Sequence, residues 1–353
     1  MLAILGLTLD ELKSCLKKQN FPVFAARQIF SWIYKKEIFD FDRMTDLSRE
    51  LRDFLKSNFY ILSLALADKQ ESCDGTQKFL FGIPDDSGFL IRREGNQGIE
   101  SVIIPAPRRL TACISTQAGC KFACRFCASG ALGWQRNLST GEIIEQAIYL
   151  KKIAARRLNN LVFMGIGEPL DNYDNLLKAI HILNSPYSLN IGARKMTIST
   201  CGLIPGIKRL AEENLQIELS VSLHAADNKI RDYLMPVNKK YPLDELLSAC
   251  RDYFKKTKRQ VTFEYVLIKG MNSQPEQAKK LTRLLAGLDA KVNLIPASPF
   301  RNEFPPPDKS DMLIFRGILL KAGIPSTIRR PRGADIQAAC GQLRLTNLWC
   351  RKV

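Results

Sequence analysis

Extended apolar segments and helical segments alternate along this chain from about residue 109 onward, and this alternation limits the possible folds more than any other feature. Each βα unit returns the chain to the same end of the next strand, so the pattern predicts a parallel sheet. About six units predict an α/β fold, a partial (β/α)6 TIM-like barrel with its active site at the carboxyl ends of the strands. The predicted strands are residues 110–116, 161–166, 195–200, 217–223, 261–268 and 292–295.

The chain before residue 109 carries two other patterns. Residues 1–62 repeat apolar side chains at helical spacing, which predicts a small helical accessory domain with a basic exterior. Residues 63–108 hold short extended runs between Asp-Gly and Ser-Gly turns, which predicts a β-rich connector. The runs are 78–82, 89–92 and 100–104. We therefore expect three parts: a helical domain over 1–62, a connector over 63–108 and a barrel domain over 109–353.

The charge of the chain indicates a polyanionic partner. Lys and Arg number 52 against 35 Asp and Glu, which gives a net charge of +17. Nucleic acid is the partner that such a balance favours, although some soluble proteins are merely basic. Arg329, Arg330 and Arg332 cluster near the C-terminus, and arginine suits phosphate contacts.

The apolar runs and the cysteines indicate the compartment. No apolar run reaches the roughly 18 residues that a membrane span needs, so we expect no membrane partner. The first residues do not read as a signal peptide. Ten cysteines in such a chain predict a reducing, cytoplasmic location, where clustered cysteines bind metal or act in catalysis.

Three of these cysteines, Cys120, Cys124 and Cys127, follow the first predicted strand with the spacing Cys-x3-Cys-x2-Cys. Three thiolates can hold three irons of a 4Fe-4S cluster and leave the fourth iron open to a small molecule, whereas ferredoxin clusters have all four capped. Zinc would need a fourth ligand, and the chain has two histidines and no second Cys-x2-Cys pair. Zinc and a chance grouping remain the alternatives.

Small and polar residues end the next three predicted strands. Gly167 and Glu168 lie in Gly-Ile-Gly-Glu-Pro at the second strand end, where a carboxylate can meet a ligand's ammonium group. Ser199 ends the third strand, and Ser222, Leu223 and His224 end the fourth. Each alone is more often structural than functional, but their shared position at strand ends favours a ligand site.

Three further residues stand outside the cysteine motif. Cys113 lies within the first predicted strand, and Cys340 lies among small residues near the arginine cluster. The ordinary role of a cysteine outside a metal motif is that of a buried small apolar residue. Glu100 is a carboxylate in an apolar strand, and its ordinary role is to lie on a solvated strand face.

Together these motifs resemble the RlmN-type RNA adenine methyltransferases of the radical S-adenosylmethionine superfamily. The resemblance covers nearly the whole chain, including Arg-Gln-Ile-Phe-Ser-Trp-Ile-Tyr in the N-terminal region. The other matching segments are Gln-Ala-Gly-Cys-Lys-Phe-Ala-Cys-Arg-Phe-Cys, Met-Gly-Ile-Gly-Glu-Pro-Leu, Ser-Val-Ser-Leu-His-Ala and Arg-Gly-Ala-Asp-Ile-Gln-Ala-Ala-Cys-Gly-Gln, at residues 117–127, 164–170, 220–225 and 332–342.

The resemblance implies a radical methyl transfer that uses two molecules of S-adenosylmethionine per turnover. The first would methylate Cys340, and the second would bind the open iron and yield a 5′-deoxyadenosyl radical. This radical would activate the methyl group for addition to carbon 2 of adenine. Cys113 would then release the product by forming a disulfide with Cys340, and Glu100 matches the family's general base. Ser199, Ser222, Leu223 and His224 match positions that line the cofactor, and Gly167 and Glu168 match the motif for its amino group.

The resemblance further implies the substrates adenosine 2503 of 23S rRNA and adenosine 37 of tRNA. It implies an electron donor such as flavodoxin or ferredoxin, and a monomer. The chain departs from the family at Ala297-Ser298-Pro299, where Ser298 would replace a cofactor-binding Asn with a shorter side chain. Methylation at carbon 8 of the same adenine remains open, as does an RNA-binding metalloprotein without catalysis, although such a protein needs neither Cys113 nor Cys340.

Overall fold

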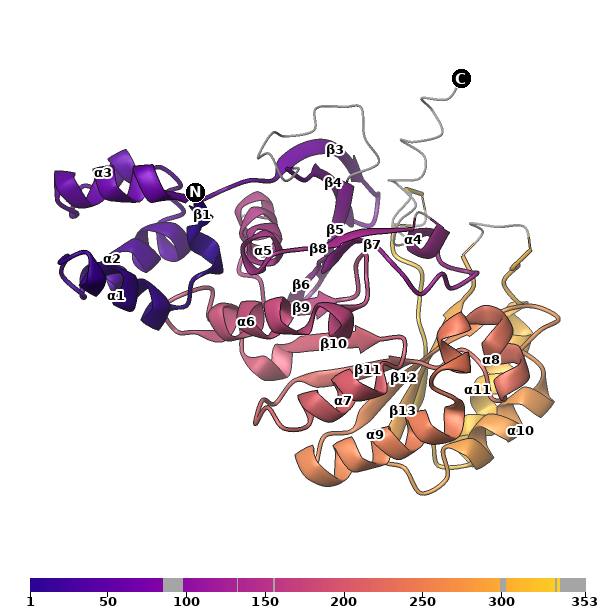
Figure 1. Ribbon diagram of the computed structural model, residues 1–353. Helices are drawn as coiled ribbons and strands as arrows, with labels where there is room; N and C mark the ends of the chain where they lie inside the picture. Colours follow the sequence, from indigo (N-terminus) through magenta and orange to yellow (C-terminus); the bar gives the residue numbers. More distant parts are fainter. Residues whose placement is uncertain (85–97, 132, 155, 299–302, 334, 337–353) are drawn as a thin grey trace.

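The computed structural model describes residues 1–84, 98–131, 133–154, 156–298, 303–333 and 335–336. A small helical unit at the N-terminal end lies beside a large sheet that is covered by helices (Figure 1). The predicted strand at 89–92 and Cys340 lie outside the described residues.

The N-terminal unit contains the helices that the apolar spacing predicts. A capping box begins α1, since Thr8 N–H donates to Glu11 Oε2 at 2.8 Å and Glu11 N–H donates to Thr8 Oγ1 at 3.2 Å. The short strands β1 and β2 pair in parallel beside these helices. The elements are β1 (Leu2–Ala3), α1 (Leu9–Lys18), α2 (Ala25–Phe30), α3 (Arg49–Asn58) and β2 (Phe59–Tyr60).

Within the described residues, ten strands form one sheet in the order β14-β13-β12-β11-β10-β9-β6-β5-β4-β3. In this sheet, β6, β9, β10, β11, β12, β13 and β14 are parallel, as predicted. The strands β3, β4 and β5 pair antiparallel and continue the same sheet beyond β6. Their bounds are β3 (Ala65–Glu71), β4 (Gln77–Gly82), β5 (Gly98–Ala106), β6 (Arg109–Cys113), β9 (Asn160–Phe163), β10 (Met196–Thr200), β11 (Glu218–Ser222), β12 (Val261–Leu267), β13 (Ala290–Pro296) and β14 (Ser326–Ile328).

Helices connect the parallel strands in the predicted rhythm of six βα crossovers, counted over the described residues, and β14 follows the last of them. The predicted capping box at Ser139 and Glu142 is confirmed at the start of α5, with Ser139 N–H donating to Glu142 Oε2 at 2.8 Å. No helix of the described residues is long and apolar enough to cross a membrane. The helices are α5 (Thr140–Ala154), α6 (Tyr173–Asn184), α7 (Ile204–Leu210), α8 (Asn228–Leu234), α9 (Leu243–Thr257), α10 (Pro275–Leu284) and α11 (Lys309–Lys321).

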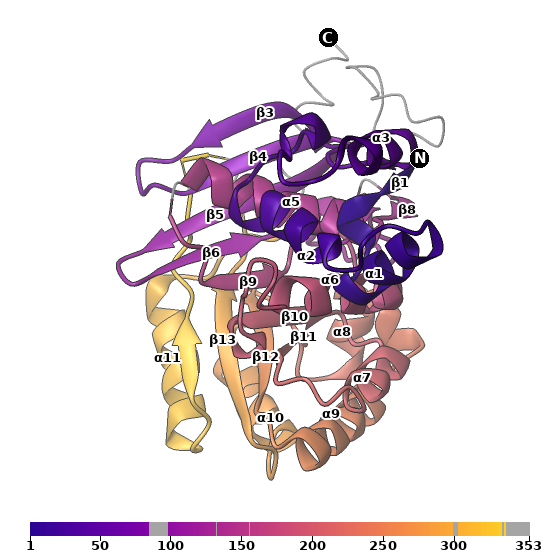
Figure 2. The ribbon, with the colours of Figure 1, turned by 90° about the vertical axis from the view of Figure 1, so that its left-hand side faces the viewer.

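The partial TIM-like barrel is thus confirmed. The sheet does not close, because β14 and β3 form its two edges in the part of the chain that the structure describes (Figures 1 and 2). The segment after β6 forms a small antiparallel pair, β7 (Gln117–Gly119) and β8 (Trp134–Asn137), with the short helix α4 (Ala128–Ala131) between them.

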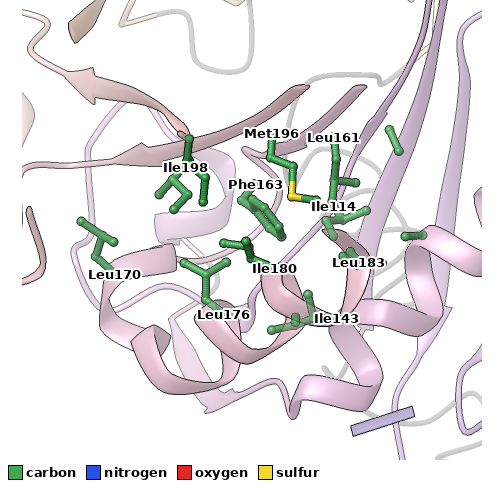
Figure 3. Packing of buried hydrophobic residues seen from close by; sticks show 14 of the residues in the cluster. Ile114, Ile143, Leu161, Phe163, Leu170, Leu176, Ile180, Leu183, Met196 and Ile198 are labelled. Atoms are coloured by element: carbon green, nitrogen blue, oxygen red, sulfur yellow. The ribbon is translucent and has the colours of Figure 1, made fainter. Parts of the chain in front are cut away.

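The hydrophobic core lies between the sheet and the helices. Figure 3 shows Ile114 and Phe163 from the sheet side packed against Ile143 of α5 and Ile180 of α6. Successive strand residues face opposite sides, so every second residue points away from these helices. We call that opposite side the inner face.

The register of three strands places a row of residues on the inner face. Lys78, Val102 and Cys113 are direct neighbours across β4, β5 and β6. Cys113 and Val102 are buried, yet they do not belong to the hydrophobic core that packs against the helices. Ser101, the residue beside Val102, faces the other way and donates to Gln146 Oε1 of α5 at 2.8 Å.

Candidate active site at the carboxyl ends of the strands

The three clustered cysteines lie on one loop, residues 120–127, between β7 and α4, which we call the cysteine loop. All three thiols are half-buried. Backbone hydrogen bonds hold the loop at three points: Cys120 N–H to the Gly133 carbonyl at 2.9 Å, Arg125 N–H to the Leu234 carbonyl at 3.0 Å, and Cys127 N–H to the Cys124 carbonyl at 3.0 Å. The loop is therefore anchored both to the segment before β8 and to the end of α8.

Without a metal, the surroundings of the cysteine loop disfavour thiolates. Burial raises the pKa of Cys120 to about 12, and burial followed by repulsion from Cys127 and Cys120 raises the pKa of Cys124. A metal centre reverses this preference, because its positive charge stabilises thiolates. Over the described residues, no three His, Cys, Asp or Glu side chains converge on a single ion. A 4Fe-4S cluster does not require such convergence, since each thiolate binds a separate iron.

The Gly-Ile-Gly-Glu-Pro segment packs directly against the chain that leads into the cysteine loop. A Cβ on Gly165 would lie 2.6 Å from the Ile114 backbone, and one on Gly167 would lie 2.5 Å from Gln117 Cβ. Gly167 also has a φ of +105°, which side chains rarely adopt. The two glycines therefore serve close packing, and this packing places Glu168 beside the cysteine loop.

Glu168 is buried and held by backbone donors. Its Oε1 accepts from Leu170 N–H at 3.0 Å, and its Oε2 accepts from Cys201 N–H at 2.7 Å. Burial nevertheless raises the pKa of Glu168. The side chains of Thr200 and Cys201 also hydrogen-bond to Glu168, so a ligand's ammonium group would share its oxygens with these donors.

Ser199 and Ser222 lie on the inner face at the ends of β10 and β11. The register pairs Ser199 with Ser220 and Ser222 with Glu264. Leu223 differs, because its side chain is in the core, while its N–H donates to the Glu264 carbonyl and its own carbonyl accepts from Arg231 Nε. The structure thus brings the two serines to one face and gives Leu223 a packing role.

His224 is a buried, neutral imidazole. Burial, followed by the positive charge of Arg231, lowers its pKa to about 3. Its Nδ1 accepts a hydrogen bond from Val266 N–H at 2.9 Å, so the proton of the neutral ring is on Nε2. The ring packs edge-on against Phe126 of the cysteine loop at 4.8 Å between centroids. His224 can therefore donate a hydrogen bond to a ligand but cannot act as a cation.

The sequence analysis did not identify Arg231, which is fully buried behind these strand ends. Its guanidinium donates to the carbonyls that follow β10 and end β11, and it joins them to the segment after α8. The acceptors are Leu223 O, Cys201 O, Ser222 O, Tyr241 O and Asn238 Oδ1, at 2.7 to 3.3 Å. A lone arginine in the last turn of a short helix carries no sequence signal for this role.

The ordinary alternative for Glu100, a solvated strand face, is excluded because its side chain is 3% exposed. Glu100 forms an ion pair with the equally buried Lys78, with 2.9 Å between Nζ and Oε2. Both lie on the inner face near Cys113, since the register pairs Lys78 with Val102 and Val102 with Cys113. Lys78 was not predicted, although a lysine within the apolar run 78–82 was an available signal.

A second buried carboxylate, Glu264, also escaped the sequence analysis. Its Oε1 accepts from Ser220 Oγ at 2.8 Å, and its Oε2 accepts from Asn293 Nδ2 at 2.9 Å. It lies beside Ser222 in the register of β11 and β12. Ser298 is half-buried just after β13, at the same end of the sheet.

Comparisons with known proteins agree with this arrangement. A family model described as the radical SAM superfamily matches residues 114–282, and one described as the ribosomal RNA large subunit methyltransferase N-terminal domain matches residues 2–61. A crystal structure of a radical SAM methyltransferase from Sphaerobacter thermophilus superposes with a TM-score of 0.90 at 42% identity, covering 97% of this chain and 99% of that one.

Curated relatives match over nearly the full length. A probable dual-specificity RNA methyltransferase RlmN from Clostridium novyi is 46% identical, covering 97% of each chain. A relative with the same name from Thermotoga petrophila is also 46% identical, covering 98% of each chain.

Proposed function

The chain belongs to the RlmN family of radical S-adenosylmethionine RNA methyltransferases, and on this basis we propose that it methylates carbon 2 of adenosine in RNA. The observation that carries the proposal is similarity along almost the whole chain, including the N-terminal unit that accompanies the barrel in this family. The shared inner face of Glu100, Cys113, Ser199 and Ser222 supports a common site for these residues.

The cofactors are a 4Fe-4S cluster and S-adenosylmethionine, two molecules of the latter per turnover. When bound, they supply the one-electron chemistry that carbon 2 of adenine requires, because this carbon is not nucleophilic. We assign Cys120, Cys124 and Cys127 to the cluster. Gly167, Glu168, Ser199, Ser222, His224 and Ser298 would surround the bound S-adenosylmethionine, with Glu168 accepting from its ammonium group and Leu223 supporting them from the core.

Outside the cluster, one cysteine carries the methyl group and a second cysteine releases the product. Cys340 receives it and presents it to the base, and Cys113 attacks the sulfur of Cys340 to release the product and form a disulfide. Glu100 accepts the proton that carbon 2 loses. Its ion pair with Lys78, with 2.9 Å between Nζ and Oε2, holds the Glu100 carboxylate on the inner face near Cys113.

The substrates are 23S rRNA, at adenosine 2503, and tRNA, at adenosine 37. Exposed aromatic rings beside the cysteine loop support an RNA surface there, because rings and cations bind unpaired bases. Lys121 Nζ lies 4.4 Å from the ring centroid of Trp134, and the Arg125 guanidinium lies 4.2 Å from that of Tyr233. We further propose that the enzyme is a cytoplasmic monomer that takes electrons from a flavodoxin or a ferredoxin.

The test is anaerobic incubation of the cluster-loaded protein with S-adenosylmethionine, a reductant, and unmodified 23S rRNA or tRNA. Nucleosides from the digested RNA are then identified by mass spectrometry. We expect 2-methyladenosine, and we expect Cys340→Ala and Cys113→Ala each to abolish turnover. A product of 8-methyladenosine would reassign the reaction, and cluster-loaded protein that binds RNA without methylating it would overturn the proposal.

A further inference from the structure

The segment after β14 crosses from one edge of the open sheet to the other. We call its described residues, 329–333 and 335–336, the strap. It starts on the β13 side, where Arg329 N–H donates to the Leu294 carbonyl at 2.7 Å. It ends against the turn 72–76, which joins β3 to β4 at the opposite edge (Figures 1 and 2).

Two carboxylates, one from each side, join the strap to this turn. Asp335 of the strap accepts hydrogen bonds from Ser72 Oγ and from Cys73 N–H, the latter at 2.9 Å. Asp74 of the turn accepts from Gly333 N–H at 3.2 Å and lies 3.6 Å from Arg332 Nη1. Hydrogen bonds from Ser72, then from the Cys73 backbone, with smaller contributions from its own backbone and the Cys73 side chain, lower the pKa of Asp335 to about 2.

The turn is itself rigid. Ser72 N–H donates to the Thr76 carbonyl at 2.8 Å, and Thr76 N–H donates to Asp74 Oδ1 at 2.9 Å. Gly75 adopts a φ of +80°, which allows this tight geometry. The strap is therefore docked on a preformed site.

The docking point lies at a distance from Cys113 that a short stretch of chain can span. Gln70 of β3 is level with Cys113 three strands away, which corresponds to roughly 14 Å. Ser72, which donates to Asp335, lies two residues farther along, or roughly 7 Å, so Asp335 is anchored on the order of 16 Å from the position of Cys113. Cys340 follows Asp335 by five residues, and five residues of chain span at most about 17 Å.

We propose that the paired contacts of Asp74 and Asp335 form a latch that holds the strap so that Cys340 stays within reach of Cys113. The inference rests on the proposed roles of these two cysteines. Residues 72–76, 332, 333 and 335 are then positioning residues for the methyl carrier. The latch raises the local concentration of one thiol near the other, as a short tether does.

The test measures how fast the two thiols meet, without RNA or S-adenosylmethionine. Cluster-loaded protein carrying Cys73→Ser is treated anaerobically with diamide; this change removes the exposed thiol in the turn and keeps a hydroxyl that can donate to Asp335 as the thiol does. The oxidant takes up the two thiol protons and electrons as the disulfide forms, and peptide mass spectrometry follows the Cys113–Cys340 link. Asp335→Ala and Asp74→Ala are compared with Glu71→Gln, which removes a charge next to the turn from an acid that pairs with Lys69.

We expect the two latch variants to form the link about tenfold more slowly and the Glu71→Gln protein to match its parent. Equal rates in all four proteins, or no link in the parent, would overturn the latch. Neither result would bear on the proposed methylation of RNA, which is tested separately by identifying the modified nucleoside.

Hydrogen exchange checks the contact itself. Both latch variants should speed exchange of the Cys73 and Gly333 amides together, although these residues lie far apart in the sequence. Unchanged exchange at both amides would also overturn the latch.

Discussion

Lys78 and Glu100 form an ion pair across β4 and β5 in which the lysine side chain is fully buried and the glutamate side chain is 3% exposed. The pair lies on the inner face next to Cys113. A buried charge without its partner is costly, whereas a matched pair is roughly neutral in free energy compared with apolar side chains. The pair is therefore weak evidence for a contribution to stability.

Removing only the lysine should reveal that cost. We expect Lys78→Met to lower the free energy of unfolding by about 3 to 5 kcal/mol, because Glu100 then loses its ammonium partner. The double variant Lys78→Met/Glu100→Gln should recover part of the loss. Urea denaturation measures both. The control is Lys69→Met on β3, whose ion pair with Glu71 is exposed and should change stability by less than about 1 kcal/mol.

Arg231→Lys should be strongly destabilising although the positive charge is retained. A lysine ammonium has three donors at one point and cannot reach acceptors on both sides, so buried carbonyls after β10 and β11 lose their partners. We expect a loss of about 3 kcal/mol in the free energy of unfolding. Arg209→Lys, at an exposed ion pair with Asp174, is the matched control and should leave the free energy of unfolding almost unchanged. Comparable melting temperatures for both variants would contradict the bracing role.

Gly167→Ala should destabilise the site in two ways: the new Cβ would collide with Gln117, and alanine is strained at the positive φ of this position. The new Cβ would lie 2.5 Å from Gln117 Cβ and 2.9 Å from Gln117 N. Gly270 has a φ of +75°, but a Cβ added there would meet no atom within 4 Å, so Gly270→Ala tests the backbone strain alone. We expect about 1 kcal/mol for Gly270→Ala and at least about 3 kcal/mol for Gly167→Ala. Thermal unfolding measures both variants. Equal losses of stability in Gly167→Ala and Gly270→Ala would show that the backbone near Gly167 shifts to make room for the alanine side chain.

The neutral His224 should make stability depend on pH. Its folded pKa of about 3 lies below the ordinary value of about 6.5, so the unfolded chain binds the extra proton between these values. Stability therefore falls as pH falls through this range. His224→Asn, which tolerates the φ of +56°, lacks this effect. From about pH 6.5 to about pH 5.0, the wild-type protein should lose about 1.5 kcal/mol more than the variant in denaturant titrations. An equal loss of unfolding free energy in the wild-type protein and in His224→Asn would show that burial does not lower the pKa of His224.

Trp134 should contribute to RNA binding. Its ring is 43% exposed and lies beside the cysteine loop under Lys121. Stacking of one base on an aromatic ring contributes about 1 to 3 kcal/mol, so Trp134→Ala should raise the KM for RNA about tenfold or more with kcat little changed. Leu313→Ala, an exposed apolar residue of α11, should leave both constants unchanged. Steady-state methylation assays separate the two effects.

The sequence predicted those features that depend on local pattern. Apolar periodicity identified the N-terminal helices and the βα rhythm, and the capping box identified the start of α5. The motif residues could be placed at strand ends because parallel strands share one carboxyl edge. The burial of Glu100 could not be predicted, since it depends on a lysine from a neighbouring strand and on which face of the sheet is covered.

The sequence by itself determined the fold class, the cysteine motif and the family, because short-range periodicity and residue spacing carry that information. The tertiary structure alone decided which residues meet across long separations. Antiparallel register placed Lys78 beside Glu100 and level with Cys113, and Arg231 reached carbonyls from two other strands. The latch joins residues about 260 positions apart, and only the folded sheet, whose two edges the strap connects, brings Asp335 to Ser72. Such contacts are set by packing geometry, which no local pattern encodes.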